Sequence, residues 1–142
     1  SNRKRSEDEI LKINERFKII TRATNDVLWD WDLVTNDIWW NENFYYLFGF
    51  DKETYSPDIN AWFEGIHPDD RERVNLKIKN AIDEARSYWS DEYRFLKSDG
   101  TIVDILDRGY LMYDKSGKPI RMLGAMMDVS ERKHYLASLK IA

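Results

Sequence analysis

Apolar residues near the N-terminus recur at alternating three- and four-residue steps. They are Ile10, Ile13, Phe17 and Ile20, and charged Glu, Lys and Arg residues fill most of the positions between them. This spacing predicts an amphipathic helix over residues 1–23 with a coiled-coil-like seam. We expect the seam to form a dimer contact, although about two heptads do not distinguish self-pairing from packing against a sheet of the same chain.

Alternation of apolar and polar residues replaces this spacing after residue 26 and predicts strands. A first hairpin is expected through the turn residues 35–37, and it places the adjacent Trp39 and Trp40 on opposite faces of the sheet. A second hairpin is expected at Asp99 and Gly100, a dipeptide typical of tight turns. The predicted strands cover residues 27–33, 38–40, 88–97, 101–113 and 119–129.

Helical signals lie between the second and third of these strands. Asn41 and Gly49 are a typical cap and stop for a short helix, and weaker helical patterns cover residues 52–55 and 58–64. The strongest helix begins at His67, because a proline suited to the first helical position and two aspartates that favour the positive end of the helix dipole follow it. Its expected buried face consists of Val74, Ile78, Ala81, Ile82 and Ala85. This order of elements predicts an α+β fold, with helices inserted as a block on one face of an antiparallel sheet.

The composition fits one globular domain. The chain has 142 residues, of which 42% are apolar and 34% charged, and this length suffices to bury a single core. A net charge of −4 with dispersed Lys and Arg argues against nucleic-acid binding, and the apolar runs are too short for membrane contact by this segment. The chain has no cysteine, which excludes a disulfide framework and fits a reducing compartment, so we expect a cytoplasmic location.

Three motifs occur along the chain in the order and spacing of a known family. They are WDWDL at 29–33, HPDDR at 67–71 and GAMMDVSERK at 124–133. Over residues 24–133 the chain resembles a PAS domain of the PAS fold-3 type with a C-terminal PAC motif, as found in bacterial sensor proteins. The resemblance implies a PAS-like five-stranded antiparallel sheet with helices on one face and flanking helices at both ends. Asp104 is a departure, because the family often carries Trp at that place.

The resemblance implies a sensory module and not an enzyme. It divides the chain into an N-terminal dimerisation helix (1–23), a sensory domain (24–129) and the start of an outgoing signalling helix (130–142). We expect a homodimer within a larger signal-transduction protein, a two-component histidine kinase or a cyclic-dinucleotide enzyme, with the output domain downstream in the same chain. Two alternatives stay open: a ligand-free protein-protein interaction module, and a small enzyme on a cone-shaped α+β fold.

A ligand pocket in such a domain would lie between the sheet and the inserted helices. Light-sensing members of the family that this chain resembles use a flavin and a reactive cysteine, and such an adduct is excluded because cysteine is absent. Members that bind haem commonly use a histidine in or just after the long central helix, and haem ligation of that type is not expected because residues 69–86 contain no histidine. A small organic ligand remains open, and plain core packing is the alternative. Strand alternation and helix spacing nominate seven residues for the pocket: Trp29, Trp31, Phe44, Ile78, Tyr93, Phe95 and Met126.

Catalytic and metal-binding residues are not predicted. His67 lies at a helix start, where its side chain serves as a cap, and His134 lies among charged residues, so a metal site would have too few ligands. Carboxylates on facing strands suggest an acid–base pair at first sight. We interpret them as surface ion pairs instead, since Glu92 alternates with Arg94 in an outward phase. These carboxylates are Asp91, Glu92, Asp104 and Asp107.

The last predicted strand runs directly into a polar helix. Asp128 or Ser130 is expected to cap this helix, and Asp128 followed three residues later by Glu131 resembles a capping box. We therefore assign Asp128, Ser130 and Glu131 to signal transfer from the sheet to the helix. A helix that merely packs on the domain is the alternative.

Overall fold

The computed structural model describes the backbone of residues 2–141 and the side chains in that range except those of Phe17 and Ile141. Five antiparallel strands form one sheet in the order β2-β1-β5-β4-β3. The strands are β1 (Val27–Asp32), β2 (Ile38–Trp40), β3 (Tyr88–Leu96), β4 (Ile102–Tyr113) and β5 (Pro119–Asp128). The five predicted strands are confirmed, and β1 and β5 pair near the middle of the sheet although they are far apart in sequence.

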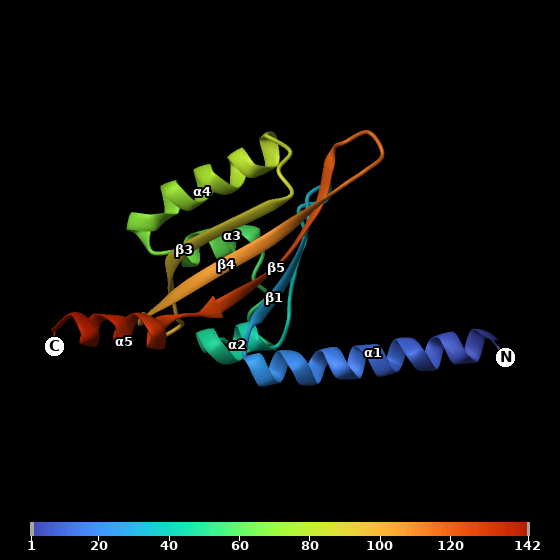
Figure 1. Cartoon of the computed structure of the whole chain (residues 1–142), viewed down its shortest axis with the longest axis horizontal. Coiled ribbons are helices and arrows are strands. Elements are labelled where there is room, and N and C mark those ends of the chain that lie inside the picture. The colour runs from blue at the N-terminus through green and yellow to red at the C-terminus, as the bar shows by residue number, and fades with distance from the viewer. Residues whose placement is uncertain (1, 142) are drawn as a thin grey trace.

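The helices inserted between β2 and β3 lie over one face of the sheet (Figure 1). Two further helices flank the domain, and they leave the same end of the sheet in opposite directions (Figure 1). The helices are α1 (Asn2–Thr24), α2 (Asn43–Phe48), α3 (Ile59–Gly65), α4 (Pro68–Asp83) and α5 (Ser130–Ile141). The arrangement is the predicted α+β fold, with flanking helices at both ends.

The short helix α2 begins differently from the expectation. Glu42 occupies its N-cap position, whereas the Asn41 side chain donates to the carbonyl of Asp26 at 3.2 Å. The predicted stop at Gly49 is confirmed, since this residue has φ 77°, a left-handed conformation that favours glycine. The pattern at residues 52–55 is a turn and not a helix. A tertiary hydrogen bond to the residue before β1 therefore occupies the side chain that the local sequence assigns to the cap.

The start of α4 follows the local sequence signals. His67 Nδ1 accepts a hydrogen bond from the N–H of Asp69 at 3.2 Å, which confirms the predicted cap. Asp70 binds β3 by accepting from the backbone N–H and the guanidinium of Arg94 at 2.9–3.0 Å. The Arg94 hydrogen bonds lower the pKa of Asp70 to about 2. The other end differs from the prediction, because Ala85 lies beyond the helix, exposed and with φ 52°.

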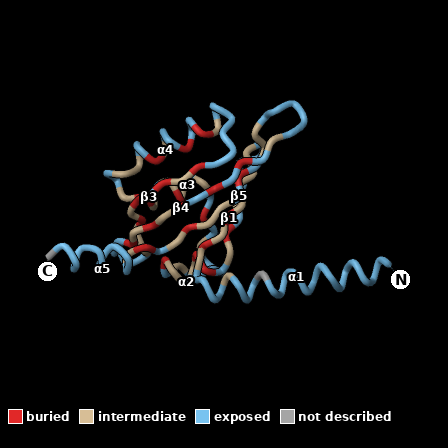
Figure 2. The backbone as a smooth tube through the Cα atoms, viewed as in Figure 1, coloured by how far each residue is buried: buried red, intermediate tan, exposed pale blue. Residues whose placement is uncertain are grey.

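The core lies between the sheet and α2, α3 and α4. Figure 2 shows buried residues along the strands and on the sheet-facing side of α4, whereas α1 and α5 are exposed almost throughout. The alternation of β2 behaves as expected: Trp40 is 7% exposed and Trp39 is 56% exposed. The opposite face of the sheet carries no helix in Figure 1.

Candidate ligand cavity and signalling joint

A carboxylate lies in the middle of the core. Asp107 is on the inward face of β4 and is 1% exposed. Its Oδ1 accepts from Trp29 Nε1 of β1 at 2.8 Å, and its Oδ2 accepts from the Tyr93 hydroxyl of β3 at 2.6 Å. The Tyr93 oxygen in turn accepts from Trp62 Nε1 of α3 at 2.9 Å. This hydrogen-bonded chain connects three strands of the sheet with the helix that covers them.

Two glycines allow Trp29 to reach Asp107. Gly124 of β5 and Gly109 of β4 are paired, and Gly124 is also the partner of Trp29 in β1. A Cβ atom would lie 2.2 Å from the Trp29 ring at Gly124 and 2.6 Å from it at Gly109. The indole therefore lies across both glycines, a path that side chains at these positions would block.

Burial changes the acidity of this cluster. The pKa of Asp107 is raised to about 7, chiefly by burial and to a smaller extent by the negative charge of nearby Asp91, while the hydrogen bonds from Tyr93 and Trp29 oppose the rise. Burial and the Asp107 carboxyl group also raise the pKa of Tyr93 well above its usual range. Asp107 thus changes its charge near neutral pH inside the core.

The interpretation of the strand carboxylates as surface groups is wrong for two of them. Asp91 faces Asp107 across the β3–β4 pair, and it is 6% exposed. From α4, Arg73 donates to Asp91 and Lys77 lies 3.9 Å away, while Asp91 Oδ2 is buried without a hydrogen-bond partner. Asp91 lies between the buried Trp89 and Tyr93 in the alternation of β3. That inward phase is the sequence signal that could have identified both aspartates.

A small cavity adjoins Asp107. Its volume is about 10 Å³, close to the space that one water molecule needs. The indole N–H of Trp89 is buried, has no hydrogen-bond partner and belongs to the cavity wall. Three isoleucines also contribute to the wall. The remaining lining consists of Trp29, Trp31, Trp40, Trp62, Trp89 and Asp107.

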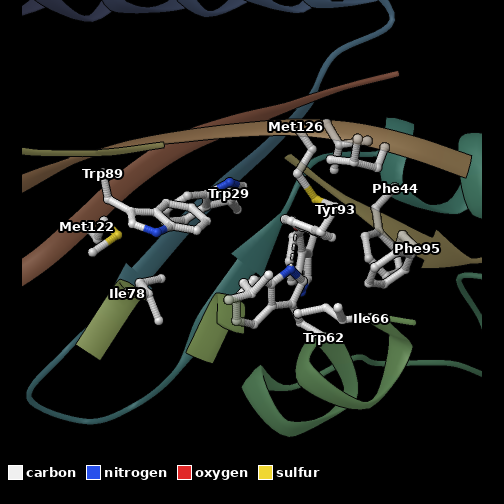
Figure 3. Close-up of a cluster of buried hydrophobic side chains, with 14 of the residues drawn as sticks. Trp29, Phe44, Trp62, Ile66, Ile78, Trp89, Tyr93, Phe95, Met122 and Met126 are labelled. Carbon is white, nitrogen blue, oxygen red and sulfur yellow. Dashed lines mark hydrogen bonds between the residues drawn. The ribbon is translucent and has the colours of Figure 1, made fainter. Parts of the chain in front are cut away.

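The seven predicted pocket residues divide into two groups. Trp29, Trp31 and Ile78 line the cavity. Trp31 is only partly buried, and its Nε1 donates to Asn36 in the β1–β2 turn at 2.9 Å. The others pack in the surrounding core, where Figure 3 shows the aromatic rings of three of them close together. This second group is Phe44, Tyr93, Phe95 and Met126.

The joint between β5 and α5 is held by β4. Asp128 Oδ1 accepts from the N–H of Ser130 at 2.9 Å. The Ser130 hydroxyl accepts from the N–H of Asp104 at 3.0 Å, and the N–H of the buried Val129 donates to the Asp104 carbonyl at 2.9 Å. Glu131 is exposed in the first turn and its side chain makes no hydrogen bond with any described residue, so the expected capping-box bond is not formed.

Ion pairs tie the first turn of α5 to the outer face of the sheet. Arg132 contacts Glu92 of β3 at 2.9 Å. Lys133 lies 3.4 Å from Asp104 of β4 and 3.8 Å from Glu92. Glu92 and Asp104 are thus the surface ion-pair partners that the sequence predicted. Asp104, the departure from the family pattern, binds the outgoing helix through its backbone and its side chain.

The end of α1 is attached to α2. The amide of Asn43, which is 8% exposed, donates to the carbonyls of Thr21 at 3.0 Å and Asp26 at 2.8 Å. Burial raises the pKa of Asp26. A polar groove of about 610 Å³ separates this attachment from the joint, with Asn43 and Asp128 among its lining residues. The chain therefore enters and leaves the domain on two sides of one groove, an arrangement that the sequence did not reveal.

The predicted dimer seam is exposed where the structure describes it. Ile10, Ile13 and Ile20 are 57%, 62% and 60% exposed. The side chain of Phe17 lies outside the described part of the structure. No contact of these isoleucines with the sheet is formed, because α1 points away from it (Figure 1).

Comparison with known proteins agrees with this architecture. The sequence profile of the PAS fold matches residues 37–126, which is more than half of the chain. The chain belongs to the PAS fold family. The structure of this PAS domain is also similar to that of solved sensor domains. Within residues 2–141, no helix has both the length and the apolar character of a membrane span.

The similar proteins are parts of signalling proteins. A sensory box histidine kinase/response regulator from Burkholderia thailandensis E264 is 30% identical, with a TM-score of 0.73 over 89% of this chain and 93% of that chain. The N-terminal domain of a diguanylate cyclase with PAS/PAC sensor from Marinobacter aquaeolei is 25% identical, with a TM-score of 0.68 over 77% and 99% of the two chains. The protein named "Probable diguanylate cyclase DgcE" from Escherichia coli (strain K12) is 28% identical over 130 residues, which are 92% of this chain and 12% of that protein.

Proposed function

We propose that this PAS domain is the sensory and dimerisation input domain of a larger signal-transduction protein, a histidine kinase or a cyclic-dinucleotide enzyme. The observation that carries the proposal is the joint at Asp128, where a central strand of the sheet continues into an exposed helix. The relatives named above support this assignment, since the matching parts belong to such proteins. Residues 1–23, 24–129 and 130–142 then act as dimerisation helix, sensory domain and outgoing helix.

The joint can convert a change in the sheet into a movement of α5. Asp104 holds Val129 and Ser130 through its backbone, and the same residue pairs with Lys133 one turn later. A shift of β4 therefore displaces two points of the first turn of α5 together and changes the direction of the helix. The bias needed between two signalling states is only about 1–3 kcal/mol, which a few such contacts can supply.

This proposal assigns no catalysis to the domain itself. The buried carboxylates Asp91 and Asp107 are assigned to the core, where Asp107 accepts from Trp29 and Tyr93 and Asp91 pairs with Arg73 and Lys77 of α4. A cytoplasmic location is part of the proposal and is supported by the absence of cysteine.

A variant of the joint tests the proposal. In the protein that carries this chain, Asp128→Ala removes the acceptor of the Ser130 N–H, and loss of such a cap costs about 1 kcal/mol. We expect the domain to stay folded while the basal output shifts and the response to stimulus weakens. Melting temperature and output activity are measured together.

The matched control is Asp114→Ala. Asp114 also accepts backbone N–H bonds, from Ser116 and Lys118, but it lies in the β4–β5 turn away from α5. It should lower stability to a similar extent and leave output unchanged. A folded Asp128→Ala variant with unchanged basal and stimulated output would contradict a role of the joint in signal transfer.

A ligand-free interaction module is the second candidate. The tight filling of the core, with about 10 Å³ left beside Asp107, favours it. In that case α1 and the joint act as proposed, but the input is a partner protein or a change in dimer geometry instead of a ligand.

A further inference from the structure

The cavity beside Asp107 has an unusual chemical composition for a hydrophobic core. Five indole rings and one carboxyl group contribute to its wall together with three isoleucines. Asp107 has two hydrogen-bond donors from side chains, whereas an ionised carboxylate offers about four acceptor sites. The Trp89 N–H is an unpaired donor at the same wall. Buried polar groups left in this state are costly unless another molecule satisfies them.

The chemistry of the wall restricts what such a molecule can be. The lining residues include no Lys, Arg or His that could neutralise an anion. An anion in the cavity would instead be repelled by the Asp107 carboxylate. A purely apolar molecule would leave Trp89 and Asp107 without additional partners. A cation is attracted by the carboxylate and by the faces of indole rings, which are the most favourable aromatic partners for positive charge. An oxygen atom two or three bonds from the cation would accept the Trp89 N–H.

We propose that the cavity is a binding site for a small organic cation that carries a hydroxyl or similar oxygen, the chemistry of an amino alcohol. The cation lies against Asp107 and the indoles, and its oxygen accepts from Trp89 Nε1. This inference rests on the proposed sensory function and deepens it, because it assigns the chemical class of the ligand.

The walls of the cavity belong to elements of different length, and this difference explains how a ligand larger than 10 Å³ enters. Asp107 and Trp89 belong to the long central and edge strands β4 and β3, of twelve and nine residues. The isoleucines Ile38 and Ile59 belong to a three-residue strand and to the first position of a seven-residue helix, and both are partly exposed. Short elements with few contacts open at low free-energy cost. Ligand entry therefore displaces β2 and α3, while the longer strands β3 and β4 hold Trp89 and Asp107 on the other side of the cavity.

Such a displacement reaches the sheet. Trp62 of α3 is bound to Tyr93, which is bound to Asp107. Asp107 lies on β4, three residues after Asp104, the residue that holds α5. Ligand binding at this site and the movement of α5 are thus connected by a continuous set of hydrogen bonds and one strand.

Three probes of similar size test the inference on the chain of 142 residues by isothermal titration calorimetry and tryptophan fluorescence. Choline has both the cation and the hydroxyl, tetramethylammonium lacks the hydroxyl, and 3,3-dimethylbutan-1-ol is the neutral analogue of choline. We expect choline to bind with one-to-one stoichiometry and the neutral analogue to bind at least about tenfold more weakly. Equal affinity of choline and its neutral analogue, or no choline binding at about 10 mM, would overturn the inference.

Two variants assign the contacts. Asp107→Asn should weaken choline binding at least about tenfold, and Trp89→Phe should weaken choline severalfold while tetramethylammonium binds as before. The matched controls are Asp114→Asn, in the turn that follows the same strand, and the exposed Trp39→Phe, and both should leave choline binding unchanged. A folded Asp107→Asn variant with full choline affinity would overturn the site.

If Asp107→Asn does not fold, the comparison of choline with its neutral analogue on the unmodified chain decides the outcome. Failure of this inference leaves the Asp128 experiment untouched, and it favours the ligand-free module. The two proposals can therefore fail separately.

Discussion

Asp107 is the residue on which the chemistry of the core depends. Tyr93 accepts from Trp62 and donates to Asp107, and Trp29 donates to the other carboxylate oxygen. These donors suit the ionised form of Asp107, whereas burial favours the neutral form. Burial outweighs the hydrogen bonds, which is why the pKa of this group is raised to about 7.

The raised pKa of Asp107 predicts how the free energy of unfolding depends on pH. The pKa of Asp107 is about 7 in the folded chain and near the ordinary value of 3.8 when unfolded, so its contribution to stability is full below 3.8 and is lost as pH rises through 7. Relative to Asp107→Asn, the unmodified chain should lose on the order of 4 kcal/mol of unfolding free energy between about pH 4 and pH 8. Urea denaturation across this range measures the difference. Parallel pH dependence of the two proteins would show that Asp107 does not titrate in this window.

The close packing of the Trp29 ring against Gly109 predicts the effect of a larger residue at this position. A Cβ atom there would lie within 2.6 Å of Trp29, and its nearest neighbours are side-chain atoms. Gly109→Ala should therefore destabilise the chain by about 1–3 kcal/mol. The cost should shrink in a Trp29→Phe background, where the smaller ring leaves room, and urea denaturation of the four proteins of this cycle measures the coupling. Additive effects would mean that the strand backbone, and not the indole, opposes the methyl group.

Among the elements, α2 decides how the N-terminal helix is held. Its first residue, Asn43, binds the last turn of α1 and the start of β1, while Gly49 ends the helix in a left-handed conformation. A helix of six residues has little stability of its own. It keeps its position through Phe44 and Phe48, which are buried against the core.

Removal of the Asn43 amide should loosen α1 from the domain. Asn43→Ala deletes two hydrogen bonds to buried or partly buried carbonyls, and each is worth about 1 kcal/mol. We expect a lower free energy of unfolding and faster hydrogen exchange in the last turn of α1. Asn60→Ala on the exposed surface of α3 is the control and should change neither. Unchanged exchange in α1 of Asn43→Ala would show that the attachment lies elsewhere.

On the scale of the whole molecule, two apolar surfaces lack a cover. One is the seam of α1. The other is a row across the helix-free face of the sheet, where Trp39, Leu123 and Tyr110 are 56%, 39% and 64% exposed, with Asp30 of β1 between Trp39 and Leu123 in the register. Exposed apolar surfaces of this kind mark interaction sites. A second copy of the chain with a pair of α1 helices would cover the seam.

The seam predicts a dimer that depends on α1. Ile10→Glu combined with Ile13→Glu places two charges on the seam and should shift sedimentation toward the monomer. Leu76→Glu changes an equally exposed apolar residue, 59% exposed on α4, and should leave the dimer intact. A dimer that persists in the Ile10 and Ile13 variant would instead assign the contact to the outer face of the sheet.

Features that depend on neighbouring residues could be predicted from the sequence. The strands follow from alternation, and the start of α4 follows from His67, Pro68 and two aspartates. The phase of β2, with Trp40 inside and Trp39 outside, also follows from alternation. These signals succeed because caps, turns and side-chain periodicity act within a few residues.

The site required the tertiary structure. The Trp29 partner of Asp107 is 78 positions away in sequence, and two glycines from different strands admit its ring. Strand alternation places Asp91 on the inward phase, but the outward phase of Glu92 and Arg94 led us to interpret all four strand carboxylates as surface ion pairs. The sequence determined the strands, the helix starts and the family of this chain, because local interactions encode them. Only the tertiary structure decided that two aspartates lie in the core, because donors from distant strands and helices offset part of the cost of their burial.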